Sequence, residues 1–145
     1  MNEQEYKYIR NLAWDLLISA KVSELPIDIN AIASLYNFQS KLSSSKSRYE
    51  NTLIISHYIL QLFGFNTDSH YAQYLATRIL APVVVLKTLN LQSVDELCKY
   101  TDLPYNIAYK RFERLKMLIQ RDMFCTSNLE IKVLQQFSSW IESHK

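Results

Sequence analysis

Apolar residues recur along most of the chain three or four positions apart, the spacing of one face of an α-helix. This pattern predicts a first helix over residues 3–21, a second helix behind Asp28 as its N-cap, and a long helix from about residue 104 to 121. Ser-x-x-Glu capping boxes at Ser93 and Ser127 predict the starts of two more helices, the second running to the carboxyl terminus.

The middle of the chain, residues 53–82, predicts two helices joined by a short turn at Gly64, the only glycine in the sequence. Small and apolar residues form one face of the second helix: Ala72, Leu75, Ala76, Ile79 and Leu80. The serine-rich residues 41–48 predict a surface loop, and the apolar run 83–86 fits either a helix or a strand. Because tight turns between strands rely on glycine, the single Gly and three Pro favour a mainly α protein.

Length and composition place the chain among globular proteins, with 145 residues, 48% hydrophobic and 21% charged. We expect a single domain, with a core over residues 1–90 and a helical part over 91–145. A net charge of +2 makes no general case for nucleic acid or membrane binding, and no apolar run approaches the roughly 20 residues that span a bilayer. The amino terminus does not resemble a secretory signal, and Cys98 and Cys125 lack CxxC spacing, so we expect a cytoplasmic protein.

A histidine, His57, lies in the apolar first helix of the central pair. A zinc peptidase requires a second histidine four residues later and a glutamate at the next position, but Gln61 and Tyr58 stand there. Glutamine binds zinc poorly, and tyrosine, with an ordinary pKa of about 10, is a weak base at neutral pH. We therefore expect a packed histidine, no catalytic or metal site and no cofactor. A different metal site, combining His57 with Asp68 or His70, is the alternative.

The central helix pair resembles the core of the ImmA/IrrE family of metallopeptidases, in which a helix (I/L)AHExxH precedes a helix ExxANxFAAxLLMP. Here SHYILQ (residues 56–61) aligns with the first motif and YAQYLATRILAP (71–82) with the second. LPIDINAIASLYNF (25–38) also resembles a segment of the family that precedes the metal helix. The resemblance covers most of residues 8–120. It implies a zincin-like helical core, with the family's β-hairpin reduced or absent, and a degenerate member without peptidase activity.

Residues 93–118 have the outline of a helix-turn-helix, a short helix, a turn and a longer helix. In a DNA reader Lys110, Arg111 and Arg114 would contact phosphates, while residues at the start of the second helix would contact bases. The same segment resembles the carboxy-terminal region of the ImmA/IrrE family. Glu113 among the cations is typical of a solvated mixed-charge face.

Active members of that family cut transcriptional repressors that phages and integrative elements often encode. The resemblance therefore implies a non-enzymatic antirepressor of a phage or mobile element, which sequesters a helix-turn-helix repressor. Aromatic content and the family's substrate groove give the candidate contact residues: His57, Tyr58, Gln61, Tyr71, Tyr74, Tyr105 and Tyr109. The ten tyrosines also leave room for a homodimer. The alternative function is a DNA-binding transcriptional regulator using Lys110, Arg111 and Arg114.

Overall fold

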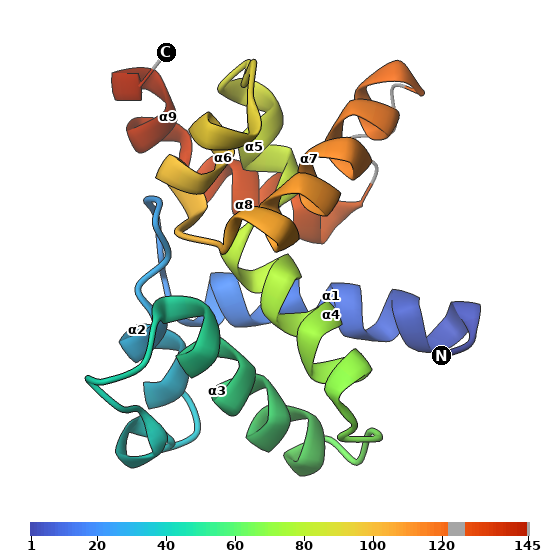
Figure 1. The fold of residues 1–145 in the computed structure, drawn as a ribbon, viewed down its shortest axis with the longest axis vertical. Helices are drawn as coiled ribbons and strands as arrows, with labels where there is room; N and C mark the ends of the chain where they lie inside the picture. The colour runs from blue at the N-terminus through green and yellow to red at the C-terminus, as the bar shows by residue number, and fades with distance from the viewer. Residues whose placement is uncertain (122–126, 145) are drawn as a thin grey trace.

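The computed structural model describes residues 1–121 and 127–144, and Figure 1 shows their helical arrangement. The helices are α1 (Glu3–Ser19), α2 (Ile29–Ser34), the 3₁₀ turn η1 (Gln39–Lys41), α3 (Arg48–Leu62), α4 (Ser69–Leu80), α5 (Val83–Thr88), α6 (Val94–Thr101), α7 (Tyr105–Gln120), α8 (Asn128–Gln136) and α9 (Ser138–His144). No β-strand occurs within the described ranges. The prediction of a mainly α protein is confirmed.

Helix α4 occupies the centre of the fold and connects its two halves. It packs along α3 on one side and contacts α1 where the two helices cross. In Figure 1, α2 and α3 lie below α1, whereas α5, α6, α7 and α9 lie above it. Helix α8 packs against α1 and α5, so the carboxy-terminal part is built directly onto the first helix.

The predicted central pair is present as α3 and α4. Helix α3 begins at Arg48, earlier than expected, because Ser47 and Glu50 form a capping box there. Gly64 has the left-handed φ of 77° that glycine adopts without strain, and this residue turns the chain after α3. All five small and apolar residues predicted to share a face of α4 are buried.

The N-cap of α4 gives a first prediction. The Asp68 carboxylate accepts hydrogen bonds from the backbone N–H groups of His70 and Tyr71, at 3.0 and 3.2 Å. We expect Asp68→Ala to lower the free energy of unfolding by about 1 kcal/mol, because both donors lose their acceptor. Urea denaturation measures this loss, with Asp15→Ala, at an exposed position within α1, as the control. Equal effects of the two substitutions would contradict a capping role.

Residues 83–86, which fit either a helix or a strand, form the helix α5, which begins directly after Pro82 and packs on α8. Two local predictions need correction. The single helix expected from Ser127 onward is two helices, α8 and α9, with Phe137 between them. Ser93 caps α6, but the side chain of Glu96 accepts from the backbone of Gln92 instead of returning to Ser93, so that capping box is incomplete.

The expected surface loop at residues 41–48 is held in place by one side chain. Asn51 in α3 accepts a hydrogen bond from the Ser43 backbone N–H (3.0 Å) and donates to the Ser43 carbonyl (2.9 Å). The loop is therefore exposed at Ser44, Ser45 and Ser47 and fixed at its base. It occupies the position at which the family resemblance implies a hairpin.

The hydrophobic core draws residues from all parts of the described chain, and the largest fully buried side chain is Phe137. The two tryptophans occupy different environments. Trp14 in α1 is buried, and its Nε1 has no acceptor among the described residues. Trp140 in α9 is half-buried and stacks on His144, with ring centroids 4.2 Å apart. Every described helix is too short or too polar to cross a membrane.

Candidate functional site

His57 is a half-buried residue on α3 with one ring nitrogen hydrogen-bonded, as the sequence led us to expect. Its Nδ1 lies 3.3 Å from the carbonyl oxygen of Thr67. Because a carbonyl only accepts, Nδ1 carries the hydrogen and donates it. Gln61, one turn later, is exposed, and Tyr58 packs edge-on against the His57 ring at 5.5 Å between centroids. His57 is therefore packed among its neighbours.

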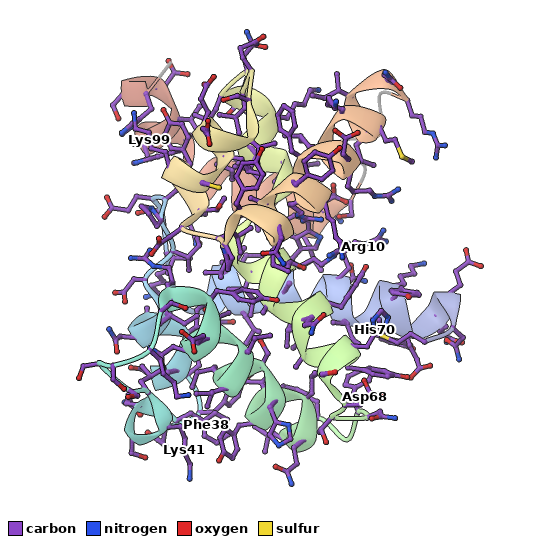
Figure 2. All side chains as sticks on the ribbon, viewed as in Figure 1. Arg10, Phe38, Lys41, Asp68, His70 and Lys99 are labelled. Atoms are coloured by element: carbon purple, nitrogen blue, oxygen red, sulfur yellow. The ribbon has the colours of Figure 1, made fainter. Side chains whose placement is uncertain are left out.

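Asp68 and His70, the partners considered for a metal site with His57, have other roles. Asp68 caps α4, and Nε2 of His70 lies 3.2 Å from the Tyr6 hydroxyl on α1. Figure 2 places His70 beside the amino-terminal half of α1. Within residues 1–121 and 127–144, no three His, Cys, Asp or Glu side chains form a group that could hold a metal ion.

An aromatic patch, defined here as Tyr36, Phe38, Tyr58 and Phe63, surrounds the carboxyl end of α3. Measured between ring centroids, Tyr36 lies 5.7 Å from Phe63 and 6.4 Å from Phe38, and Phe38 lies 5.5 Å from Tyr58. The Lys41 ammonium lies 4.9 Å from the centre of the Tyr58 ring, and Figure 2 shows Phe38 and Lys41 at the same end of the molecule. Phe63 is 47% exposed, so the patch reaches the surface.

Sequence reasoning identified only Tyr58 among the four patch residues. The missed residues lie just outside helices α2 and α3, where periodicity gives no information about burial. One signal was present: Leu62 and Phe63 are consecutive apolar residues immediately before the turn at Gly64. Leu62 is 57% exposed, which makes this helix end unusually apolar for a surface.

The prediction that Tyr71 contacts a partner needs correction, because this residue is 8% exposed and belongs to the core. The Tyr71 hydroxyl donates to Oε2 of Glu5 at 2.8 Å, which joins α4 to the first turn of α1. The backbone N–H of Asn2 donates to Oε1 of the same carboxylate. These bonds, the Asn2 contribution being larger, lower the pKa of Glu5 below its ordinary 4.5, while the bond to Glu5 raises the pKa of Tyr71.

The Glu5 carboxylate gives a pH-dependent prediction. Its pKa is lower in the folded protein than in the unfolded chain, so its stabilising contribution is complete above pH 4.5 and disappears as the pH falls through the folded pKa. We expect Glu5→Gln to be less stable than the wild type at pH 7, with the difference shrinking in acid. Thermal unfolding from pH 7 to pH 3 measures it, with Glu3→Gln as control. A difference that is constant across that range would contradict the assignment.

The other predicted tyrosines divide between two places. Tyr74 on α4 packs against Tyr6 at 4.8 Å and supports the guanidinium of Arg78, whose Cζ lies 3.7 Å from the ring centre. Tyr105 and Tyr109 are exposed at the start of α7. The predicted contact residues therefore lie on three different helices, and the aromatic patch contains one of them.

The helix-turn-helix outline is present as α6 and α7, joined through residues 102–104. Asp102 takes a left-handed φ of 58° and pairs with Arg48 of α3 at 3.4 Å, which fixes the turn against the central pair. The prediction that Arg111 contacts DNA phosphates on the exposed face of α7 needs correction, because Arg111 does not lie on that face. It is 6% exposed and hydrogen-bonded to a backbone carbonyl, whereas Lys110 and Arg114 are exposed.

Two cavities, one lined by α3, α4 and α7 and the other by α1, α4 and α7, adjoin each other, since Tyr74, Arg78 and Arg114 line both. The first is about 350 Å³, and its other lining residues include Lys110 and Arg111. The second is about 330 Å³ and extends to Lys7 and Arg10 on α1. Sequence reasoning missed Arg10 and Arg78, because nothing in the local pattern of α1 or α4 indicates that they meet α7.

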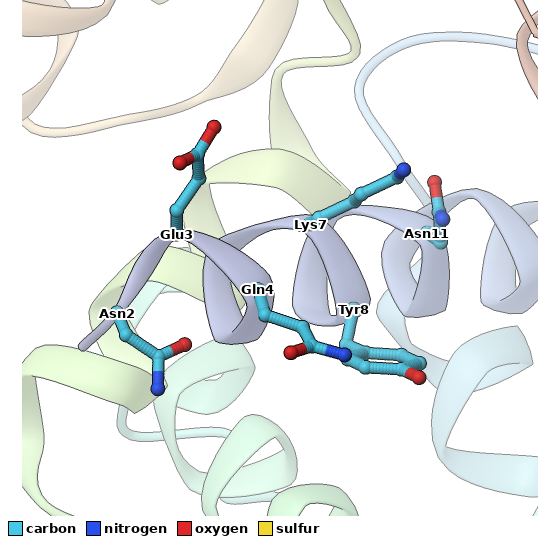
Figure 3. A pocket seen from close by; sticks show the side chains of 6 residues that line it. All are labelled: Asn2, Glu3, Gln4, Lys7, Tyr8 and Asn11. Atoms are coloured by element: carbon cyan, nitrogen blue, oxygen red, sulfur yellow. The ribbon is translucent and has the colours of Figure 1, made fainter.

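A larger hollow of about 570 Å³ lies along the outside of α1 (Figure 3). Its described lining comes from this one helix: Asn2, Glu3, Gln4, Lys7, Tyr8 and Asn11. Polar side chains dominate it, and the figure shows them side by side along the helix. Ligand sites are normally concave and lined by several elements, so this surface offers little for binding.

Comparison with protein-family models, curated proteins and solved structures finds no significant match to this chain. The resemblance to the ImmA/IrrE family therefore stays a prediction from the motifs of the sequence. The structure defines two candidate binding surfaces, the aromatic patch and the arginine-lined cavities.

Proposed function

We propose that the protein is a non-enzymatic regulator of a phage or mobile element that binds and sequesters a helix-turn-helix transcriptional repressor. The observation that carries this proposal is the aromatic patch at the end of α3, the helix that aligns with the family's metal-binding motif. Tyr58 stands in place of the family's glutamate base and Gln61 in place of its second histidine, and the end of this helix presents Leu62 and Phe63 to solvent.

The composition of the patch favours a protein partner. Aromatic side chains are enriched in the centres of protein interfaces and contribute most of the binding energy there. Lys41, stacked on Tyr58, supplies a cation at the edge of the patch. An amphipathic helix of the repressor would place its apolar face on Phe63 and Leu62. A partner that binds only DNA-free repressor removes it from its operator by mass action, without proteolysis.

The test combines binding with operator release. The repressor retained by the tagged protein from its native host is identified by mass spectrometry, then purified and titrated. We expect Leu62→Ser/Phe63→Ser to weaken binding by at least about thirtyfold, as for loss of about 2 kcal/mol at an interface hot spot. Tyr8→Ser, an equally exposed aromatic on α1, is the matched control.

Operator DNA carrying a fluorescent label distinguishes the outcomes. Addition of wild-type protein should release intact repressor from the DNA, and the double variant should release it only at correspondingly higher concentration. A retained repressor that is shortened would overturn the non-enzymatic proposal. Equal binding by the double variant and the wild type would overturn the assignment to the aromatic patch.

DNA binding through α7 is the second candidate, favoured by the exposure of Tyr105 and Tyr109 at the helix start beside Lys110. Two of the three cations predicted for it, Lys110 and Arg114, are exposed and available for phosphates. This candidate requires duplex binding that weakens steeply with salt, by a slope that decreases when both are changed to glutamine. A duplex affinity that both substitutions leave unchanged would rule out this candidate function.

A further inference from the structure

Four arginines meet where α1, α4 and α7 approach each other: Arg10, Arg78, Arg111 and Arg114. None of the four is in the ion pairs Arg48–Asp102 and Lys116–Glu113, which lie elsewhere in the described part of the chain. Glu3 is the one acidic residue among the described lining of the two cavities. Figure 2 shows Arg10 between α1 and α7.

Arg111 forms the floor of this arginine cluster. Its Nε and Nη2 both donate to the carbonyl oxygen of Ala81, at 3.2 and 2.8 Å, at the junction between α4 and α5. A guanidinium held by two hydrogen bonds, 6% exposed and lining a cavity, is a fixed donor in a site of low dielectric.

Arg78 is also held by neighbouring side chains. Its guanidinium stacks on the Tyr74 ring, and its Nη1 donates to Thr77 Oγ1 at 2.8 Å. Burial, followed by the neighbouring charges of Arg114 and Arg10, lowers the pKa of Arg78. Burial and the charge of Arg78 likewise lower that of Arg111. Like charges gathered in a partly buried site cost free energy, and a bound anion would offset that cost.

We propose that the arginine cluster is a phosphate-binding site, which takes the phosphate groups of a nucleotide or of a nucleic-acid strand. Arginine forks match the oxygens of phosphate, and four guanidinium groups with Lys110 supply more positive charge than one carboxylate would balance. The two adjoining cavities, with Arg78 and Arg114 shared, accommodate two neighbouring phosphates. The apolar Ile107 and the Tyr49 ring in the first cavity offer a surface for the sugar or base.

This site is independent of the proposed repressor binding, since the aromatic patch contributes none of its residues. It shares Lys110 and Arg114 with the helix-turn-helix candidate, but Arg10 and Arg78 lie on α1 and α4 and belong to this site alone. The experiment therefore uses Arg78→Gln and Arg10→Gln, which leave both other surfaces intact. Lys132→Gln, at an exposed cation of α8, is the matched control.

Isothermal titration calorimetry with inorganic phosphate, pyrophosphate and a single-stranded oligonucleotide tests the proposal. It also shows whether the phosphate groups belong to a nucleotide or to a nucleic-acid strand. We expect pyrophosphate or the oligonucleotide to bind, with affinity at least tenfold lower for Arg78→Gln and unchanged for Lys132→Gln. Tighter binding of the oligonucleotide than of pyrophosphate assigns the site to a nucleic-acid strand; the reverse order assigns it to nucleotides. If Arg78→Gln does not fold, Arg10→Gln replaces it, because Arg10 is an exposed lining residue of the second cavity and the same loss of affinity is expected.

Two results would overturn the proposal. One is binding of all three phosphate probes that both glutamine variants leave unchanged. The other is no binding by any probe, together with a midpoint of thermal unfolding that is the same in phosphate and chloride buffers of equal ionic strength. A ligand that occupies the folded site has to raise that midpoint, so the second measurement does not depend on the heat of binding.

Discussion

Phe137→Ala is expected to lower the free energy of unfolding by about 3–5 kcal/mol, the usual loss for a fully buried phenylalanine. The ring of Phe137 is completely buried at the junction of α8 and α9. Beside it, the Gln136 side chain donates to the carbonyls of Leu17 and Val22, so this junction is fixed to the end of α1. Native proteins have a total free energy of unfolding of about 5–15 kcal/mol, so much of the stability depends on this one ring.

Urea denaturation followed by circular dichroism measures the effect, with Phe63→Ala as the control. Phe63 is half exposed on the aromatic patch, and we expect its removal to cost less than about 1 kcal/mol. If the two variants lost stability equally, α8 and α9 would not be part of the same core as α1. A variant of Phe137 too unstable to purify can be replaced by Phe137→Leu, for which a smaller loss in the same direction is expected.

Ala76→Leu should lower the free energy of unfolding by about 1–3 kcal/mol through overpacking. Ala76 is completely buried on α4, the helix in contact with both α3 and α1. Small residues at Ala72 and Ala76, one turn apart, allow neighbouring helices to approach closely. Three further carbon atoms at this position would force the helices apart or the side chain out of a favourable rotamer.

Gln73→Leu provides the matched comparison, because it introduces leucine on the exposed side of the same helix. We expect a change within about 0.5 kcal/mol for this variant, as for most surface substitutions. Thermal unfolding of the two proteins at pH 7 would show the difference directly. If the Ala76→Leu variant were as stable as the wild type, α4 would have more free space around it than the burial of Ala76 indicates.

The helices could be predicted because their signals are local. The apolar face of α4 and the N-caps at Asp28, Ser93 and Ser127 each depend on residues within one or two turns. An alternative stayed open where several outcomes share one local pattern. The valines of residues 83–86 fit a strand as well as a helix, and the preceding Pro82 with the packing of α5 on α8 favours the helix.

The candidate sites could be predicted only in part, because they depend on contacts between distant segments. Arg111 shows the difference clearly. Its spacing from Ala108 and Leu115 places it next to the apolar face of α7, a signal of burial that its charge conceals. The carbonyl of Ala81 that holds it, and Arg78 and Arg10 beside it, come from α4 and α1, and no spacing rule along the chain connects them.

The two tryptophans of the fold provide separate optical reporters for its two halves. Trp14 on α1 lies in the hydrophobic core, and Trp140 on α9 stacks on His144. In Trp140→Phe, fluorescence follows the amino-terminal core alone, and in Trp14→Phe it follows α9 alone. Because Phe137 and Gln136 tie α8 to α1, both emission signals should change at the same urea concentration, the signature of a single cooperative transition.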